Sequence, residues 1–121
     1  MNHKHLMIKG TIEHAPQSDE ISYVEEWLKG FAESQGMEIA GGPITSYVLD
    51  EGNRGMTAAC LIKTSHIAFH IWDELNPPMM QFDFYTCGEM NEESVLEHVD
   101  RGFGLKDYEH KVIDRSKNLN G

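Results

Sequence analysis

A serine, two histidines and a tryptophan crowd into the segment KTSHIAFHIWDE, residues 63–74. Ser65 offers a hydroxyl nucleophile, and His66 and His70 offer imidazoles that exchange protons near neutral pH. A thiol follows at Cys87, in the run FYTCG. Hydroxyl, imidazole and thiol are side chains that attack carbonyl carbons or move protons, so this part of the chain is where we expect a catalytic site.

The two histidines also allow a metal site. His66 and His70 are four residues apart, so in a strand both project from the same face, and imidazole is a frequent zinc ligand. The sequence supplies no convincing third ligand, and neither cysteine lies in a CxxC pair. We therefore expect no metal and keep zinc as the alternative.

The surrounding elements must position this segment. Strands are expected at 5–13, 44–50, 56–63, 66–72, 80–86 and 108–114, and helices at 19–35 and about 91–101. Ser18 or Asp19 would be the N-cap of the first helix, and Asn91 that of the second. The order β-α-β-β-β-β-α-β predicts an α+β two-layer sandwich, a largely antiparallel sheet with two helices on one face.

Alternation along the two central strands separates a core face from a polar face. The side that we assign to the helices carries Ile67, Phe69, Ile71, Phe82, Phe84 and Thr86. The other side carries His66, His70, Trp72, Asp83, Tyr85 and Cys87. A face that mixes imidazole, indole, phenol and thiol is a poor core, so we expect the site there.

Composition narrows the class of protein. The 121 residues suffice for one domain with a core, and no run approaches the ~20 apolar residues of a membrane helix. The start of the chain lacks the apolar stretch of a signal peptide, so we expect a cytoplasmic location, with both cysteines as thiols. The formal net charge of -10 repels nucleic acid and anionic membranes and suits a cationic ligand.

The runs SHIAFHIWDE and FYTCG resemble the bacterial and archaeal S-adenosylmethionine decarboxylases. In that family a serine-histidine strand ending in Trp-x-Glu precedes a strand that ends in Phe-x-Thr-Cys-Gly. The match is dense over residues 57–88, and KHLMIKG, the first helix and the element order also fit. The resemblance implies one such domain over residues 1–121, S-adenosylmethionine as the substrate, and a homodimer with sites near its interface.

The resemblance also implies self-cleavage between Thr64 and Ser65, with Ser65 converted to a pyruvoyl group. That cofactor would form a Schiff base with the substrate amine and accept electrons as CO2 leaves, and the product would be the aminopropyl donor for spermidine synthesis.

The resemblance assigns supporting roles to five further residues. His70 matches the histidine used in self-processing, and Thr57 stands where the family has a processing serine. Cys87 matches the acid that protonates the substrate carbon. Glu74 matches the acid that holds the ribose hydroxyls, and Trp72 lies in the segment that builds the substrate pocket.

Departures from the family pattern leave alternatives open. The family has Glu-Ser at the scissile bond, whereas this chain has Thr64-Ser65. A β-branched threonine restricts the backbone and lacks the carboxylate, so an uncleaved relative that binds a ligand or regulates a true decarboxylase is one alternative. Only Tyr47 could replace the adenine-stacking phenylalanine of the family, so a decarboxylase of arginine or ornithine is a second alternative. Strand alternation places the Ser65 and His70 side chains on opposite faces of the strand, and only a turn or bulge at Ser65 would bring them together.

Overall fold

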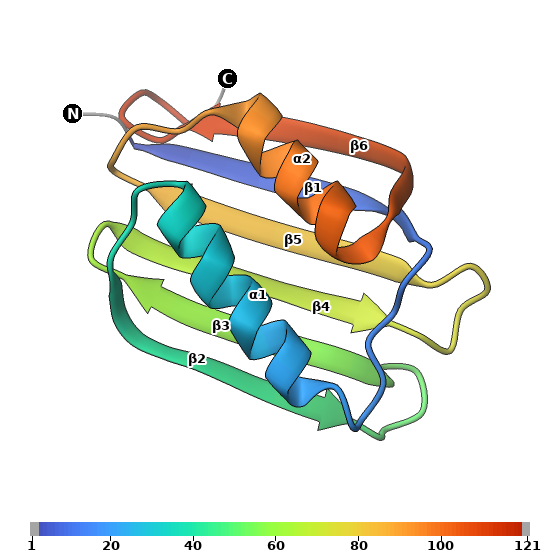
Figure 1. Ribbon diagram of the computed structural model, residues 1–121. Coiled ribbons are helices and arrows are strands. Elements are labelled where there is room, and N and C mark those ends of the chain that lie inside the picture. Colours follow the sequence, from blue (N-terminus) through green and yellow to red (C-terminus); the bar gives the residue numbers. More distant parts are fainter. Residues whose placement is uncertain (1–2, 120–121) are drawn as a thin grey trace.

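Within residues 3–119, the part of the chain that the computed structural model describes, a six-stranded sheet carries two helices on one face (Figure 1). The elements are β1 (Lys4–Ile12), α1 (Ile21–Ser34), β2 (Ile39–Val48), β3 (Gly55–Ile62), β4 (Ser65–Trp72), β5 (Met79–Thr86), α2 (Glu92–Phe103) and β6 (Leu105–Asp114). The strand order is β2-β3-β4-β5-β1-β6, and each neighbouring pair is antiparallel. The predicted α+β two-layer sandwich and its order of elements are confirmed.

The core lies between the helices and the sheet. The helices contribute Val24, Leu28, Phe31, Val95, Val99 and Phe103, and β4 and β5 contribute Ile67, Phe69, Ile71, Phe82 and Phe84. Trp27 of α1 lies edge-on to both Phe69 and Phe82, with ring centroids 6.0 Å apart in each pair. The core face predicted for β4 and β5 therefore lies under the helices.

Two strands begin three or more residues earlier than the sequence predicts. β2 begins at Ile39 rather than at residue 44, because shifts in its register with β3 accommodate the glycine and proline residues at 41–43. β6 begins at Leu105 rather than at residue 108. Gly104, in the left-handed conformation with a φ of 71°, ends α2 and lets the strand start at once.

The N-cap predicted for α2 is confirmed, and the one predicted for α1 is wrong. The Asn91 side chain accepts a hydrogen bond from the Ser94 N–H at 3.0 Å. The N-cap of α1 is Glu20, not Ser18 or Asp19, and its side chain makes no capping bond. A Glu20 carboxylate oxygen instead accepts from the Gln17 N–H at 2.9 Å, which folds the chain back before the helix.

The other face of the sheet carries the polar residues. Rows across β3, β4 and β5 are Thr57–His70–Gln81, Ala59–Ala68–Asp83 and Leu61–His66–Tyr85. Ile44 and Leu61, both exposed, add large apolar side chains to this face. Both helices lie on the opposite side, so the polar face is open in the single chain (Figure 1).

Candidate active site

Ser65 begins β4 with an unusual backbone conformation. Its φ of 147° makes it the one non-glycine residue with a positive φ among those that the structure describes. Such conformations cost roughly 1–3 kcal/mol each and concentrate at functional sites. The Ser65 Oγ lies 3.1 Å from the Nδ1 of His66. The hydroxyl therefore has an imidazole within hydrogen-bonding distance.

The preceding residue, Thr64, is held through its carbonyl and its hydroxyl. Its carbonyl oxygen accepts from the Cys87 N–H at 3.0 Å. Its Oγ1 accepts from the hydroxyl of buried Thr86 at 2.8 Å and lies 3.2 Å from the Met37 sulfur. The Cys87 N–H points at the oxygen that would carry negative charge if a nucleophile attacked this carbonyl, so it can stabilise that charge.

A second cluster lies further along β4, on the open face. Thr57 of β3 is opposite His70 in the register. The His70 Nε2 lies 3.1 Å from the Asn53 carbonyl oxygen, and the His70 ring meets Trp72 edge to face with centroids 4.4 Å apart. The Trp72 Nε1 donates to the Asn53 side-chain oxygen at 3.2 Å. Asn53 therefore orients both rings.

These side chains line an open hollow of about 410 Å³. Alanines of β3 and β4 form part of its lining, and Thr57, His70, Trp72, Gln81 and Asp83 surround them. An apolar lining with a few polar groups is typical of small-molecule sites. The hollow can therefore accept a ligand that carries both apolar and hydrogen-bonding groups.

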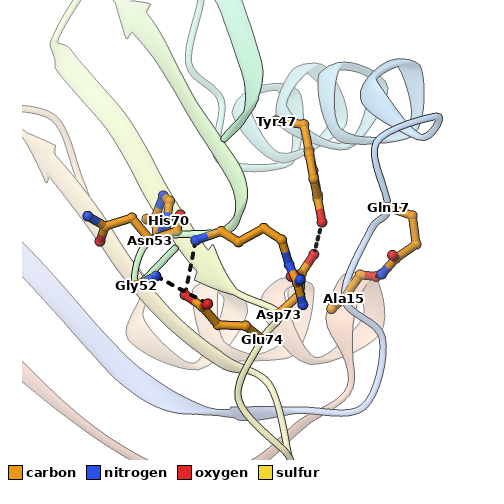
Figure 2. Close-up of polar contacts among 9 residues, drawn as sticks. Ala15, Gln17, Tyr47, Gly52, Asn53, His70, Asp73 and Glu74 are labelled. Atoms are coloured by element: carbon orange, nitrogen blue, oxygen red, sulfur yellow. Dashed lines mark hydrogen bonds and ion pairs between the residues drawn. The ribbon is translucent and has the colours of Figure 1, made fainter. Parts of the chain in front are cut away.

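Glu74 supports the turn between β2 and β3. One carboxylate oxygen accepts from the Gly52 N–H at 3.2 Å, and the other accepts from the Arg54 N–H at 3.1 Å (Figure 2). Both oxygens therefore already have backbone donors within the chain.

The Asp73 carboxylate, 5% exposed, binds two side chains beside this turn. It accepts from the Tyr47 hydroxyl at 2.5 Å (Figure 2). It also accepts from the Arg54 Nε at 3.0 Å. The hydrogen bond to Asp73 raises the pKa of the Tyr47 hydroxyl and also that of the Arg54 guanidinium. Tyr47 lies opposite Met56 and packs against the core. It therefore does not line the hollow, where a ring that stacks on adenine would have to lie.

The structure divides the residues predicted from the sequence between two places. Thr64, Ser65 and Cys87 meet where β4 begins, whereas Thr57, His70, Trp72 and Glu74 lie toward its other end. Ser65 and His70 are five residues apart, which at ~3.3 Å per residue is about 16 Å. The irregular backbone that alternation demanded at Ser65 is present, but it directs the hydroxyl to His66. His70 does not reach Ser65 within one chain.

Sequence reasoning missed the contact with His66 and the partners of Thr64. His66 follows Ser65 directly, so the adjacency was visible, but strand alternation placed the two side chains on opposite faces. Thr86 and Met37 are 22 and 27 residues from Thr64, and only the fold brings them to it. No sequence signal could have identified that pair.

The geometry also bears on the zinc alternative. His66 contacts Ser65 and His70 contacts Asn53, so the two imidazoles are directed to different partners. Across residues 3–119, no three His, Cys, Asp or Glu side chains are grouped as a metal site requires. In the same part of the chain, no helix has the length and apolar character needed to cross a membrane.

The fold matches that of a known decarboxylase. The crystal structure of the adenosylmethionine decarboxylase from Aquifex aeolicus aligns with a TM-score of 0.70 and 19% sequence identity, over 94% of this chain and 90% of that one. The sequence model of the S-adenosylmethionine decarboxylase family matches residues 4–116. The chain belongs to this family of decarboxylases.

Two similar curated proteins carry different substrates in their names. The arginine decarboxylase proenzyme of Aeropyrum pernix is 35% identical over 69 residues, covering 54% of this chain and 49% of that protein. The S-adenosylmethionine decarboxylase proenzyme of Archaeoglobus fulgidus is 32% identical over 62 residues, covering 50% and 54%. The chain thus spans about half the length of these relatives.

Proposed function

We propose that the chain is the proenzyme of a pyruvoyl-dependent decarboxylase that cleaves itself between Thr64 and Ser65. Its substrate would be S-adenosylmethionine, and its product the aminopropyl donor for spermidine synthesis. The Thr64–Ser65 bond carries the proposal, because Ser65 is strained and the Thr64 carbonyl receives the Cys87 N–H at 3.0 Å. Both features favour attack by the Ser65 hydroxyl.

Cleavage would proceed in two stages. The Ser65 Oγ bonds to the Thr64 carbonyl carbon as the C–N bond breaks, which leaves an ester and a free amine. Loss of the Cα proton then breaks the Cβ–Oγ bond and releases the Thr64 carboxylate. Water displaces ammonia from the remaining residue to leave the pyruvoyl group, which supplies an electron sink to an amine substrate. The thiol of Cys87, whose backbone N–H donates to the Thr64 carbonyl, would protonate the substrate carbon.

The separation of the two clusters supports a homodimer. About 16 Å of strand lies between Ser65 and His70, so one chain carries two partial sites. Antiparallel packing of the open faces would bring Ser65 next to His70 of the partner subunit. Exposed Ile44 and Leu61 give this face apolar surface to bury. His70 and Thr57 would then act in self-processing, and Trp72 would form a wall of the substrate pocket.

A second substrate class has its own support. Tyr47 packs on the core side of the sheet, and both Glu74 oxygens bind the β2–β3 turn. Tyr47 therefore offers no adenine stack at the hollow, and each Glu74 oxygen already accepts a backbone hydrogen bond. Asp83 at the hollow offers a carboxylate to a cationic side chain, as in arginine or ornithine. A relative named for arginine points in the same direction.

The deciding experiment is the intact mass of purified protein under denaturing conditions, fresh and after incubation. We expect two fragments that meet at residues 64 and 65, the second with a blocked amino terminus. Ser65→Ala should stay whole at about 13.8 kDa, and Ser116→Ala, which alters an exposed serine, should be cut like the wild type. A wild-type chain that remains whole would instead support the uncleaved, ligand-binding relative.

Release of CO2 then identifies the substrate. The cut protein is supplied separately with S-adenosylmethionine, arginine and ornithine. Release from S-adenosylmethionine is the expected result. Release from arginine or ornithine alone moves the assignment to the second class, and release from none of the three contradicts both.

A further inference from the structure

The imidazole closest to Ser65 belongs to His66, to which the family resemblance assigned no role. We propose that His66 is the base that accepts the Ser65 proton in the first stage of self-cleavage. This inference rests on the proposed function. It identifies a catalytic residue in the same chain as the scissile bond.

The backbone at Ser65 creates this contact. Successive side chains in a regular strand point to opposite faces, which would keep Ser65 and His66 apart. At a φ of 147° the alternation is broken, and the Ser65 Oγ lies 3.1 Å from the His66 Nδ1. The strained conformation therefore converts neighbours in sequence into a hydrogen-bonded pair of nucleophile and base.

The His66 ring is held by neighbouring strands. In the register it lies between Leu61 of β3 and Tyr85 of β5. The His66 and Tyr85 ring centroids are 5.8 Å apart, and the Arg115 guanidinium carbon lies 4.1 Å above the Tyr85 ring. His66 is half-buried, so the contact is fixed by packing but remains open to water on one side.

His70 is placed differently. Its Nε2 contacts the Asn53 carbonyl oxygen at 3.1 Å, and about 16 Å of strand separates it from Ser65 in the same chain. A histidine of the partner subunit could reach Ser65 only after dimerisation. The first proton transfer can therefore take place before that contact forms.

The proposed step balances within the chain. The proton leaves Ser65 Oγ for His66 Nδ1 as Oγ bonds to the Thr64 carbonyl carbon, and the Cys87 N–H stabilises the charge on the carbonyl oxygen. The C–N bond then breaks, and His66 returns the proton to the departing amine. The product is an ester with a free amine at residue 65, and no other reactant is consumed.

The test follows ester formation in His66→Ala and His66→Asn by intact mass, with and without hydroxylamine, which cleaves esters. We expect both variants to form the hydroxylamine-sensitive species on the order of 100-fold more slowly than the wild type, the lower range for loss of a general base. Free imidazole should restore part of the rate in His66→Ala. Circular dichroism of each variant establishes that it is folded.

His5→Ala is the matched control. His5 lies on the same face and contacts the Tyr85 ring with centroids 6.0 Å apart, but Asp83 is its hydrogen-bond partner, so its variant should be cut at the wild-type rate. Wild-type cleavage with equal cleavage of His66→Ala overturns the inference alone. A His66→Asn chain cut normally shows that no base is needed and also overturns it. A wild-type chain that stays whole overturns the proposed function as well.

Discussion

At Thr64, one hydroxyl connects the candidate scissile bond to the buried end of the sheet. Thr86 donates to it and is itself held by the Gly88 N–H at 2.9 Å, while the Met37 sulfur lies on the other side. Thr86 is fully buried, so its hydroxyl depends on these partners. The Thr64 side chain, which departs from the family pattern, thus belongs to a hydrogen-bond network with buried Thr86.

Replacing Thr64 with valine should therefore destabilise the protein. In a Ser65→Ala background, which prevents cleavage, Thr64→Val removes the acceptor of the buried Thr86 hydroxyl at a cost of about 1–3 kcal/mol. Urea unfolding measures the change. The control is Thr45→Val, because the buried Thr45 Oγ1 has no hydrogen-bond partner among the described residues and its loss should leave stability unchanged or raise it. Equal losses in the two variants would contradict the role of Thr64.

The sequence predicted the site best around the candidate scissile bond. The motif identified Ser65, Thr64 and Cys87, and the fold brings these three together. Strand alternation placed Ser65 on the face opposite His70, but it could not predict that the hydroxyl meets His66, because it carries no information on a single positive φ. It also could not predict that Glu74 binds the β2–β3 turn, since that contact spans 20 residues or more.

At the scale of elements, the β2–β3 turn and the end of β4 form one polar assembly. Asp73 binds Tyr47 and Arg54, and Glu74 binds the turn backbone (Figure 2). Asn53 of the same turn orients His70 and Trp72. The geometry of the hollow therefore depends on the stability of this turn.

The Tyr47–Asp73 bond should produce a pH-dependent stability. The hydrogen bond to Asp73 raises the pKa of the Tyr47 hydroxyl in the folded protein. The contribution of Tyr47 to stability is therefore complete below pH 10 and is lost as the pH rises through the raised pKa. Tyr47→Phe should lower the free energy of unfolding by about 1.5–3 kcal/mol at pH 7, with a smaller difference at higher pH. Urea unfolding across pH 7 to 11 measures both effects.

The half-exposed Tyr108 of β6 provides the comparison. Tyr108→Phe should leave the unfolding free energy nearly unchanged at pH 7. A Tyr47→Phe variant that is as stable as the wild type across the pH range would show that the bond to Asp73 contributes nothing.

Gly55 is required where β3 begins. Its φ is 144°, and a Cβ there would lie 1.8 Å from the Ile71 carbonyl oxygen. Gly55→Ala should cost at least about 3 kcal/mol, because the backbone cannot move without breaking the pairing with β4. Gly30→Ala in α1 meets no atom within 4 Å and should instead stabilise the helix by about 0.5–1 kcal/mol. Thermal unfolding of the two variants should move in opposite directions.

The element pattern was largely predictable because apolar spacing determines which face each element buries. Asn91 capped α2 as expected, and the core faces of β4 and β5 were correctly identified. The start of β2 was not predicted, because Gly41, Gly42 and Pro43 normally indicate a loop. Only long-range pairing with β3 keeps those residues in the sheet.

At the scale of the whole molecule, the open face and the two partial sites predict an active site composed of residues from two chains. Co-expression of two variants tests this prediction. In the proposed homodimer, co-expression of Ser65→Ala and His70→Ala chains would create heterodimers with one complete site, formed by Ser65 of one chain and His70 of the other. We expect the His70→Ala chain to stay whole by itself and to be cut in the mixture, as measured by intact mass. A partner that carries both substitutions should give no rescue. If the His70→Ala chain also stays whole when its partner is the Ser65→Ala chain, the shared site is contradicted.

The strand order has a consequence for the molecule after cleavage. A cut at 64–65 would place β1, β2 and β3 on one polypeptide and β4, β5 and β6 on the other. In the sheet, β1 lies between β5 and β6, so the two polypeptides interleave (Figure 1). They would remain joined through the β1–β5, β1–β6 and β3–β4 ladders in native solvent. Recovery from denaturant would then require a bimolecular encounter, so the cut protein would refold more slowly on dilution, whereas the intact chain would form the same sheet at a rate independent of concentration.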